Sequence, residues 1–392
     1  MLTFAETPWQ VISGAIVLLV GVLIAVRQHK YFRIPVSLAL LLYAWHTIFC
    51  VASLLYSMSN ISDAATYYVD SVSYSVSPSL GTEAIVFITS IFSRSLSFSY
   101  AGVYLVFNVF GYLGMLALFA AFRQLSVGAS RYNAMFALFV ILLPGLSFWS
   151  SAIGKDALTF MGAGLACWGA LNLGRRYPAM ILAFIAMLVA RPHIAGILAV
   201  SFTLTSLLFL RMGLLAKAFL AFLTIPLAVG AVIFVLSFTG INDPTSLEAI
   251  SQRIESQQAY NLDGGSSVSI ADMSVPMRVI TYLFRPMFLD ATGMLGLIVS
   301  VENLALLAVT AMAGYSMLSS KSSLSRFQIA FLSIFAFTTL MVLANSTANL
   351  GIAIRQKWMF LPMLLMLAFS FIGQAPKVRR VEAPMPWRRL NT

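Results

Sequence analysis

Two aspartates and a tyrosine follow the second long apolar run with a helical spacing. Tyr67 lies four residues after Asp63, and Asp70 lies seven after it, so a helix over this stretch places all three side chains on one face. A carboxylate at the boundary between lipid and water, near several cations, is well placed to act as a general base. It would take a proton from a hydroxyl that attacks an anomeric carbon. The alternative is a polar loop that begins with an Asn-Ile-Ser-Asp cap.

Basic residues are concentrated in short turns between apolar runs of the sequence. These turns contain Lys155 next to Asp156, Arg191 with His193, Arg278 followed by Arg285, and Arg355 with Lys357. A charge at membrane depth costs about 2.5–3.5 kcal/mol or more, so it is usually paired or functional. Because arginine can bind phosphate through two hydrogen bonds, converging cations predict a site for a phosphate or diphosphate group.

Each of these residues also has a purely structural interpretation. A turn can form a local ion pair, as for Lys155 and Asp156, or it can anchor a helix end at the lipid headgroups, as for Arg191 with His193. The remaining basic residues could likewise contact lipid phosphates or flank a span. The functional interpretation rests on the combination of the turns, since the face that carries them is otherwise rich in acidic residues.

The elements that must position these residues are membrane-spanning helices. Of the 392 residues, 60% are apolar and only 9% are charged, whereas a soluble protein contains roughly a quarter charged residues. This composition excludes a water-soluble enzyme. A helix needs about 20 residues to cross ~30 Å of hydrocarbon. Eleven apolar runs are predicted to be spans, namely 11–26, 34–58, 100–122, 132–149, 157–174, 178–190, 194–210, 218–238, 293–318, 327–344 and 358–373.

The distribution of charge predicts which side of the membrane each loop faces. With the N-terminus on the periplasmic side, sixteen of the 24 Lys and Arg residues fall in inside segments, whose only acidic residue is Glu382. This bias follows the positive-inside rule and places the C-terminus in the cytoplasm. The net charge of +11 is then explained by an anionic leaflet, and we expect no nucleic-acid partner. We predict a multi-pass protein of the bacterial inner (plasma) membrane.

The whole chain, residues 1–392, is predicted to be one all-α integral-membrane domain. Its polar segments are the outer loops at about 59–99 and 239–292 and the basic cytoplasmic tail 374–392. Within the outer loops, the stretch 83–93 and the segment that begins at Pro276 are predicted to be short interfacial helices.

The sequence contains no common motif for binding a nucleotide or a metal. P-loop, GxGxxG, HExxH and CxxC patterns are absent, and Cys50 and Cys167 both lie inside apolar runs. ATP-driven and dinucleotide-dependent functions therefore lack support. We predict no metal ligands and no required cofactor, although the cationic site is compatible with a divalent metal.

The layout is similar to that of a known group of membrane enzymes. One span leads to a basic inside turn, a second span follows, and Asp63 then precedes Tyr67 by four residues on the outer face. This arrangement resembles the EpsG-like and Wzy-like polysaccharide polymerases, which are related to the GT-C glycosyltransferases. The resemblance implies a GT-C-like fold in which Asp63 is the base or positions the acceptor. It also implies that basic residues at the outer ends of later spans hold the lipid diphosphate.

These observations together predict a glycosyltransferase or polymerase for exopolysaccharide or O-antigen synthesis. The donor is a sugar or oligosaccharide on a polyprenyl diphosphate such as undecaprenyl diphosphate, the acceptor is a glycan, and both meet at the surface of the lipid bilayer. Other polysaccharide-assembly proteins are potential partners. Either Asp63 or Asp70 activates the acceptor hydroxyl. The residues expected to bind the diphosphate are Arg191, Arg285 and Arg355, together with Lys155.

Three alternatives predict different residues. An O-antigen-ligase-type enzyme uses the same kind of donor but depends on His193. A transporter or flippase of lipid-linked sugars places ionisable residues near the middle of the membrane, and Glu302 is the candidate for such a position. An accessory subunit uses its outer charges only as anchors.

Overall fold

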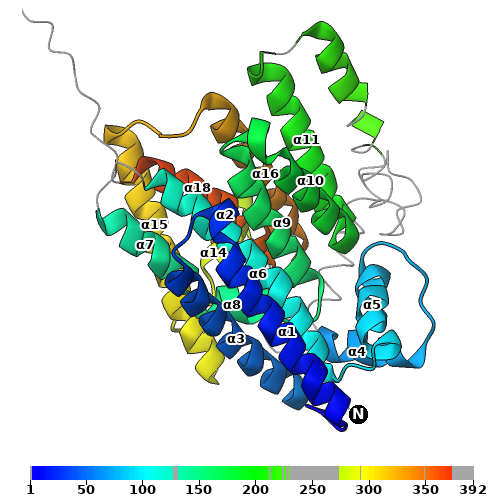
Figure 1. Cartoon of the computed structure of the whole chain (residues 1–392). Coiled ribbons are helices and arrows are strands. Elements are labelled where there is room, and N and C mark those ends of the chain that lie inside the picture. Colours follow the sequence, from blue (N-terminus) through cyan, green and yellow to red (C-terminus); the bar gives the residue numbers. More distant parts are fainter. Residues whose placement is uncertain are drawn as a thin grey trace, which may run out of the picture.

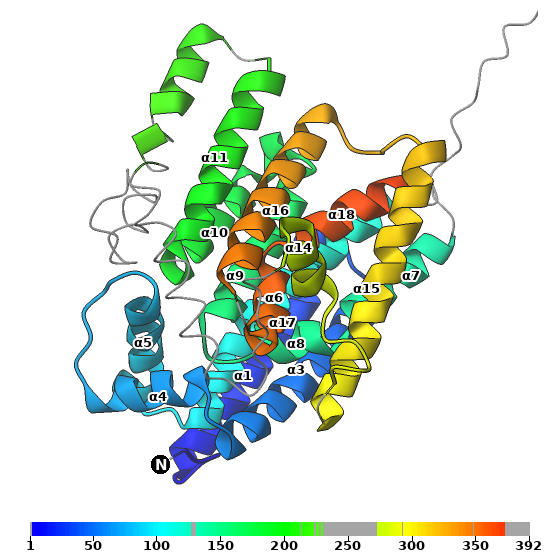
Figure 2. The ribbon, with the colours of Figure 1, turned by 180° about the vertical axis from the view of Figure 1, so that it is seen from behind.

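The described part of the chain is helical throughout. The structure, a computed structural model, describes residues 2–126, 131–211, 213–222, 225–226, 229, 273–291, 293–347 and 349–372. Within these ranges the regular elements are helices and none is a β-strand, which confirms the predicted all-α class. The helices form a bundle, and α4 (Asp63–Ser73) and α5 (Thr82–Ser90) lie at the same end as the N-terminus (Figure 1, Figure 2).

Seven helices in the described ranges are long and apolar enough to cross a membrane. They are α1 (Pro8–Arg27, followed by α2, His29–Phe32), α3 (Val36–Ser59), α6 (Tyr100–Leu125), α10 (Leu173–Ala190), α11 (Pro192–Phe209), α15 (Gly293–Ser319) and α16 (Arg326–Ser346). Two pairs of helices meet the same criterion only together, because each is bent at a short break. These pairs are α7 (Arg131–Ile141) with α8 (Pro144–Ser150), bent by 42°, and α17 (Leu350–Gln356) and η2 (Lys357–Met359) with α18 (Leu361–Phe371), bent by 60°.

These seven to nine helices support the prediction of a polytopic membrane protein, but they do not reach eleven spans. The predicted span 157–174 is α9 (Lys155–Ala170), which has only 16 residues. At 1.5 Å per residue it extends about 24 Å, less than the ~30 Å of the hydrocarbon core. The predicted span 218–238 lies for the most part outside the described residues, as does the tail 374–392.

Polar residues begin several of these helices. Ser62 caps α4 by accepting a hydrogen bond from the amide three residues later (3.3 Å), and Ser99 caps α6 in the same way (3.1 Å). Ser325 and Gln328 form a reciprocal capping box at the start of α16. Such caps satisfy amide groups that a helix end leaves without a partner, so they determine where each helix begins.

Short helices occupy the described parts of the predicted outer loops. The stretch 83–93 is helical in α5 and in the π-helical turn η1 (Ile91–Ser95), and Pro276 lies in the first turn of α14 (Val275–Phe284). Both predictions of a short helix are therefore confirmed. The stretch after Asp63 is also a helix, α4, as a shared face of its polar residues requires. Most of the second outer loop lies outside the described residues.

The short helix α9 lies in the core and packs against α6 and α10. All of its residues are buried except Lys155, Asp156 and Trp168. Glycines allow α6 and α9 to approach closely, since a Cβ on Gly114 of α6 would lie 2.7 Å from the Cα of Met161. Small residues serve this purpose in many membrane bundles. Its first residues, Lys155 and Asp156, line the cavity described below.

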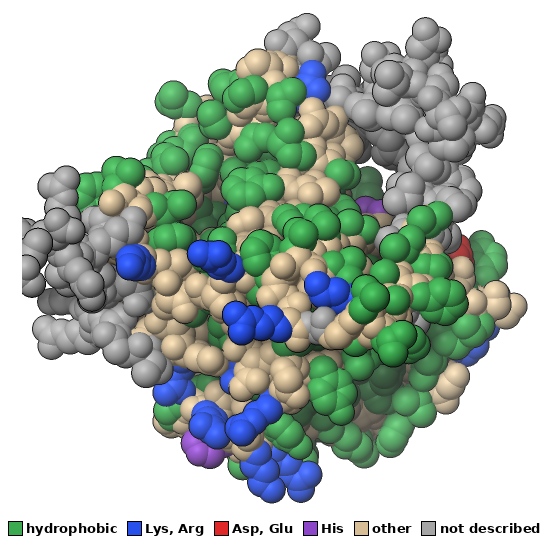
Figure 3. All heavy atoms as spheres, turned by 90° about the horizontal axis from the view of Figure 1, so that it is seen from above, with side chains coloured by type: hydrophobic (Ala, Val, Ile, Leu, Met, Phe, Trp, Pro, Cys, Tyr) green, Lys and Arg blue, Asp and Glu red, His purple; other side chains and the backbone are tan. Residues whose placement is uncertain are grey.

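Basic residues gather at the opposite end of the bundle. Arg123 donates to the carbonyl oxygen of Arg33 (2.9 Å), and Arg176 donates to the side chain of Gln124 (2.9 Å). Figure 3 views this end, and Lys and Arg side chains are spread over it. The Asp and Glu residues of the described ranges lie in α15 or toward the other end. This separation matches the bias expected between the inside and outside ends of a membrane protein.

The glycine contact between α6 and α9 yields a stability prediction. Gly164→Ala would push a methyl group against the backbone of Gly114, and overpacking of this kind costs about 1–3 kcal/mol. We expect a lower midpoint of thermal unfolding in detergent, measured by intrinsic fluorescence. The matched control is Gly314→Ala in α15, where a Cβ meets no heavy atom within 4 Å. Equal midpoints for the two variants would contradict the close α6–α9 contact.

Candidate functional site

A cavity of about 510 Å³ lies at the end of the bundle away from the basic surface. Its walls come from the last turns of α3, from α4, from α8 and the start of α9, from the turn between α10 and α11, and from α17. The charged residues that line it are Asp63, Lys155, Asp156, Arg191 and Arg355. Segments far apart in the sequence therefore contribute to one site.

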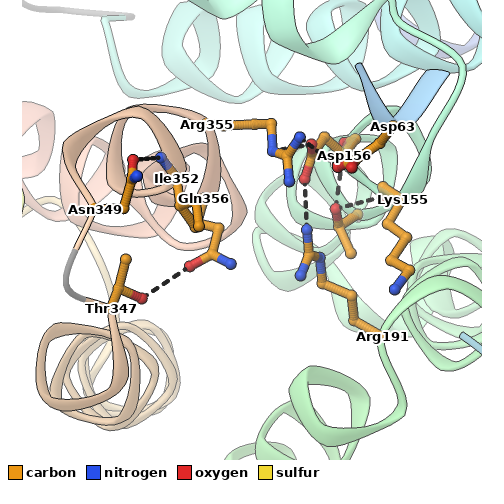
Figure 4. A network of polar contacts seen from close by, with 10 residues as sticks. Asp63, Lys155, Asp156, Arg191, Thr347, Asn349, Ile352, Arg355 and Gln356 are labelled. Atoms are coloured by element: carbon orange, nitrogen blue, oxygen red, sulfur yellow. Dashed lines mark hydrogen bonds and ion pairs between the residues drawn. The ribbon is translucent and has the colours of Figure 1, made fainter. Parts of the chain in front are cut away.

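Four of these charged side chains form a continuous chain of ion pairs (Figure 4). Arg355 Nη1 lies 2.7 Å from Asp63 Oδ2, and Arg355 Nε lies 3.0 Å from Asp156 Oδ2. The other oxygen of Asp156, Oδ1, accepts a hydrogen bond of 2.7 Å from Arg191 Nη2. The carboxylate of Asp156 is thus shared by two guanidinium groups, one on each oxygen.

The two carboxylates differ strongly in exposure. The Asp156 side chain is 15% exposed and its partner Arg191 is 10% exposed, whereas the Asp63 side chain is 53% exposed. Exposed ion pairs contribute little to stability, typically less than about 1 kcal/mol. Buried charges, in contrast, are costly when a partner is lost. The ion pairs of Asp156 are therefore the costly ones to break, and the ion pair between Asp63 and Arg355 is the one that can open at little cost.

Local structure explains how each charged group reaches the cavity. Asp63 is the first residue of α4, directly after its cap. Asp156 lies in the first turn of α9, where a carboxylate is favoured by the helix dipole. Arg191 separates α10 from α11 because Pro192 begins the second helix. Arg355 lies in the last turn of α17, whose start is capped by the side chain of Asn349 (Figure 4).

Tyr67 lies one turn after Asp63 on α4 and lines the same cavity. Its ring packs against Gly154, since a Cβ at that glycine would lie 3.6 Å from Tyr67 Cε2. Burial raises the pKa of Tyr67 to about 12, and the negative charge of Asp63 acts in the same direction. The phenol therefore stays protonated near neutral pH and can serve as a hydrogen-bond donor.

Lys155 is the cation of the cavity that has no ion pair or side-chain hydrogen bond among the described residues. The local ion pair with Asp156 is not formed, because Asp156 pairs with the two arginines instead. In Figure 4 its side chain extends away from the paired carboxylates. No side chain caps the start of α9 at Gly154. The ammonium group and the first amides of α9 are therefore available to an anion.

The arrangement suits a ligand with negative charge next to a group that loses a proton. Three cations and two carboxylates line the cavity, so it carries one net positive charge. Aromatic residues also line it, and Phe148 lies 5.8 Å from Tyr56 and 4.9 Å from Trp149 between ring centroids. No group of three His, Cys, Asp or Glu side chains in the described ranges could hold a metal ion.

The structure brings together six of the predicted site residues. Those that line the cavity are Asp63, Tyr67, Lys155, Asp156, Arg191 and Arg355. Two others, Asp70 and His193, lie close in sequence to this group but do not line the cavity. Of the two aspartates left open as the base, Asp63 is the one at the cavity.

Two predicted arginines are engaged elsewhere. Arg285 pairs with Asp290, five residues later, at 2.6 Å. The hydrogen bond from Arg285 lowers the pKa of Asp290, and the same bond raises the pKa of Arg285. Arg278 donates to the side chain of Asn345 at 3.1 Å. Neither arginine lines the cavity.

Lys357 takes part in a second, fully buried polar cluster. Its Nζ donates to the side chain of Asn303 (2.5 Å), and Asn303 donates to the carbonyl oxygen of Pro286 (2.9 Å). The neighbouring Glu302 accepts from the backbone amide of Gly145 at the start of α8. Lys357 and Glu302 are only 1% and 2% exposed. This cluster lies at the breaks of both bent helix pairs.

Some lining residues were not expected from the sequence. Ser53, Tyr56 and Ser57 of α3 face the cavity, and their spacing of three and four residues is the signal that places them on one helix face. Trp149 is a span-end aromatic residue, for which a place in the lipid interface is the usual expectation. The bridging role of Asp156 depends on contacts with Arg191 and Arg355, which local sequence does not reveal.

Comparisons with known proteins identified no relative of the chain. No protein-family model, no curated protein and no solved structure matches the chain.

The shared carboxylate yields a second stability prediction. Asp156→Asn would leave Arg191 without a charged partner and Arg355 with Asp63 alone, and loss of one partner of a buried pair costs about 3–5 kcal/mol. We expect a clearly lower thermal midpoint in detergent. Asp70→Asn is the control, since it removes an aspartate of α4 that lies outside the cavity. A midpoint of Asp156→Asn as high as that of the control would show that the ion-pair chain does not hold the site together.

Proposed function

We propose that this protein is a membrane glycosyltransferase or polysaccharide polymerase whose donor is a sugar or oligosaccharide on a polyprenyl diphosphate. The observation that supports this proposal is the cavity itself. A half-exposed carboxylate, Asp63, lies there beside Arg355, and both share the space with Lys155 and Arg191. A proton acceptor and a set of phosphate-binding cations are the two requirements of sugar transfer from a diphosphate.

The position of the cavity fits a donor that arrives through the membrane. The positive-inside rule assigns the basic end of the bundle to the cytoplasm, so the cavity faces the periplasm. Its lining includes the apolar side chains of Ile61 and Ile352 next to the charged ones. Ile61 is fully exposed, as is favourable against lipid. A polyprenyl chain could therefore remain in the bilayer while its diphosphate enters the cavity.

The proposed reaction is a displacement at the anomeric carbon of the donor. The oxygen of an acceptor hydroxyl bonds to this carbon while the bond from the carbon to the phosphate oxygen breaks. Asp63 takes the proton of the hydroxyl. The electron pair of the broken bond leaves with the polyprenyl diphosphate, whose charge is stabilised by Lys155 and the two arginines. No nucleotide is needed, in agreement with the missing phosphate-binding motifs.

The size of the cavity is compatible with this reaction. Its volume of about 510 Å³ falls within the ~300–1,000 Å³ that is usual for small-molecule sites. It can hold a diphosphate with one or two sugar rings, and a longer glycan would extend into the solvent. The aromatic residues Tyr56, Phe148 and Trp149 of the lining offer apolar faces to a sugar ring.

Replacement of the proposed base tests this function. We expect Asp63→Asn to lower sugar transfer by about 10²–10⁴-fold, the usual contribution of a general base. The assay uses purified protein in liposomes with lipid-linked repeat units, and it follows the product by gel electrophoresis. Because Asp63 is half-exposed, the variant should fold and elute from size exclusion as the wild-type protein does.

Asp70→Asn is the matched control for that assay. It makes the same change on the same helix outside the cavity, so transfer should stay near the wild-type rate. Wild-type activity of Asp63→Asn would rule out a role of this carboxylate as the base. The O-antigen-ligase alternative predicts the largest loss for His193→Ala, although His193 does not line the cavity.

A transporter of lipid-linked sugars is the second candidate function. It is favoured by the buried cluster of Glu302 and Lys357 at the breaks of two bent helix pairs, since broken helices with ionisable residues are typical of transporters. Liposomes that contain the protein and a fluorescent lipid-linked sugar separate the two functions. A transporter moves the intact lipid to the other leaflet, whereas a transferase consumes it when acceptor is present.

A further inference from the structure

We propose that the diphosphate of the donor replaces Asp63 as a partner of Arg355, and that this exchange frees the Asp63 carboxylate to accept the proton of the acceptor. The inference rests on the proposed function and adds to it a defined order of events. In the structure, Asp63 Oδ2 is paired with Arg355 Nη1 at 2.7 Å. One of the two oxygens of the proposed base is thus bound by a cation.

The two ion pairs of Arg355 are unequal, and this inequality determines which one opens. Asp156 is 15% exposed and also holds Arg191. Its removal from Arg355 would break a buried network. Asp63 is 53% exposed and has no second ion pair among the described residues. Water can solvate its carboxylate as soon as Arg355 moves away, so the Asp63 pair is the one that a competing anion can open at low cost.

A diphosphate is a stronger competitor for Arg355 than a carboxylate. Each of its phosphates carries negative charge and accepts paired hydrogen bonds from a guanidinium group. The same ligand would also reach Lys155, which has no ion pair in the described ranges, and the uncapped amides at the start of α9. Arg191 and Arg355 each retain a buried Nε without a hydrogen-bond partner, although Arg355 Nε lies within ion-pair distance of Asp156, so both provide further donors for the ligand.

Asp156 becomes a positioning residue in this scheme. It keeps Arg191 and Arg355 at fixed positions on its two oxygens, both before and after the exchange. The guanidinium group of Arg355 then changes only one of its partners. Proton acceptance by Asp63 is thereby coupled to the presence of the donor, so the base is engaged only when there is an anomeric carbon to attack.

Binding of inorganic diphosphate tests the exchange without any turnover. Isothermal titration calorimetry of the purified full chain in detergent, with EDTA present to exclude metal chelates, gives the affinity. We expect Asp63→Asn and Asp63→Ala to bind diphosphate about 2–5-fold more tightly than the wild-type protein, because an exposed ion pair of this kind is worth up to ~1 kcal/mol. Asp70→Asn removes the same charge from the same helix and should not change the affinity.

A double-mutant cycle locates the effect at Arg355. In an Arg355→Gln background, Asp63→Ala should give no gain in affinity, since Asp63 and diphosphate then no longer compete for the guanidinium group. An equal gain in Asp70→Asn, a gain that persists without Arg355, or no diphosphate binding at all would overturn the exchange. Unchanged affinity together with an inactive Asp63→Asn enzyme would reject the exchange alone. Tighter binding by the Asp63 variants, together with a wild-type protein that transfers no sugar, would reject the proposed function alone.

Discussion

A single carboxylate, Asp156, holds the charged end of the bundle together. It accepts from Arg191 on one oxygen and pairs with Arg355 on the other, and so it links α9, the turn between α10 and α11, and the bent α17. Two guanidinium groups beside each other in an apolar surrounding repel one another unless an anion lies between them. The convergence of distant segments on one cavity therefore depends on this residue more than on any other.

The short helix α9 places charged residues in the cavity. The helix α9 has only 16 residues and is buried except at Lys155, Asp156 and Trp168, while α6 and α10, which pack against it, are longer. Lys155 and Asp156, in its first turn, line the cavity. The bend of 60° after α17 brings Arg355 over the same space. The cavity is thus a consequence of backbone geometry that charges then stabilise.

The sequence predicts the helices and their turns better than it predicts the site. Apolar runs and proline at helix starts are local signals, and they place Lys155 and Arg191 at helix junctions. Arg355, expected in a turn, lies instead in the short helix α17. Which turns meet is a matter of helix rotation and bending, which no local signal specifies. Arg285 illustrates the difference. It pairs with Asp290, five residues later, and it does not line the cavity.

The charged groups around Lys357 and around Lys155, both in the part of the chain that the structure describes, differ in their access to solvent. Lys357 and Asn303 donate to neighbours, and Glu302 accepts from Gly145 through one oxygen while its other oxygen has no hydrogen-bond partner. Lys357, Glu302 and Asn303 are closed to solvent, so a ligand in the aqueous phase does not reach them. The cavity is different, because Lys155 lacks a partner in the described ranges and Asp63 keeps half of its surface free. A charged side chain that has no partner within the protein and is open to solvent is available to a ligand. By this criterion the cavity, and not the buried cluster, is where an anionic substrate gains most from binding.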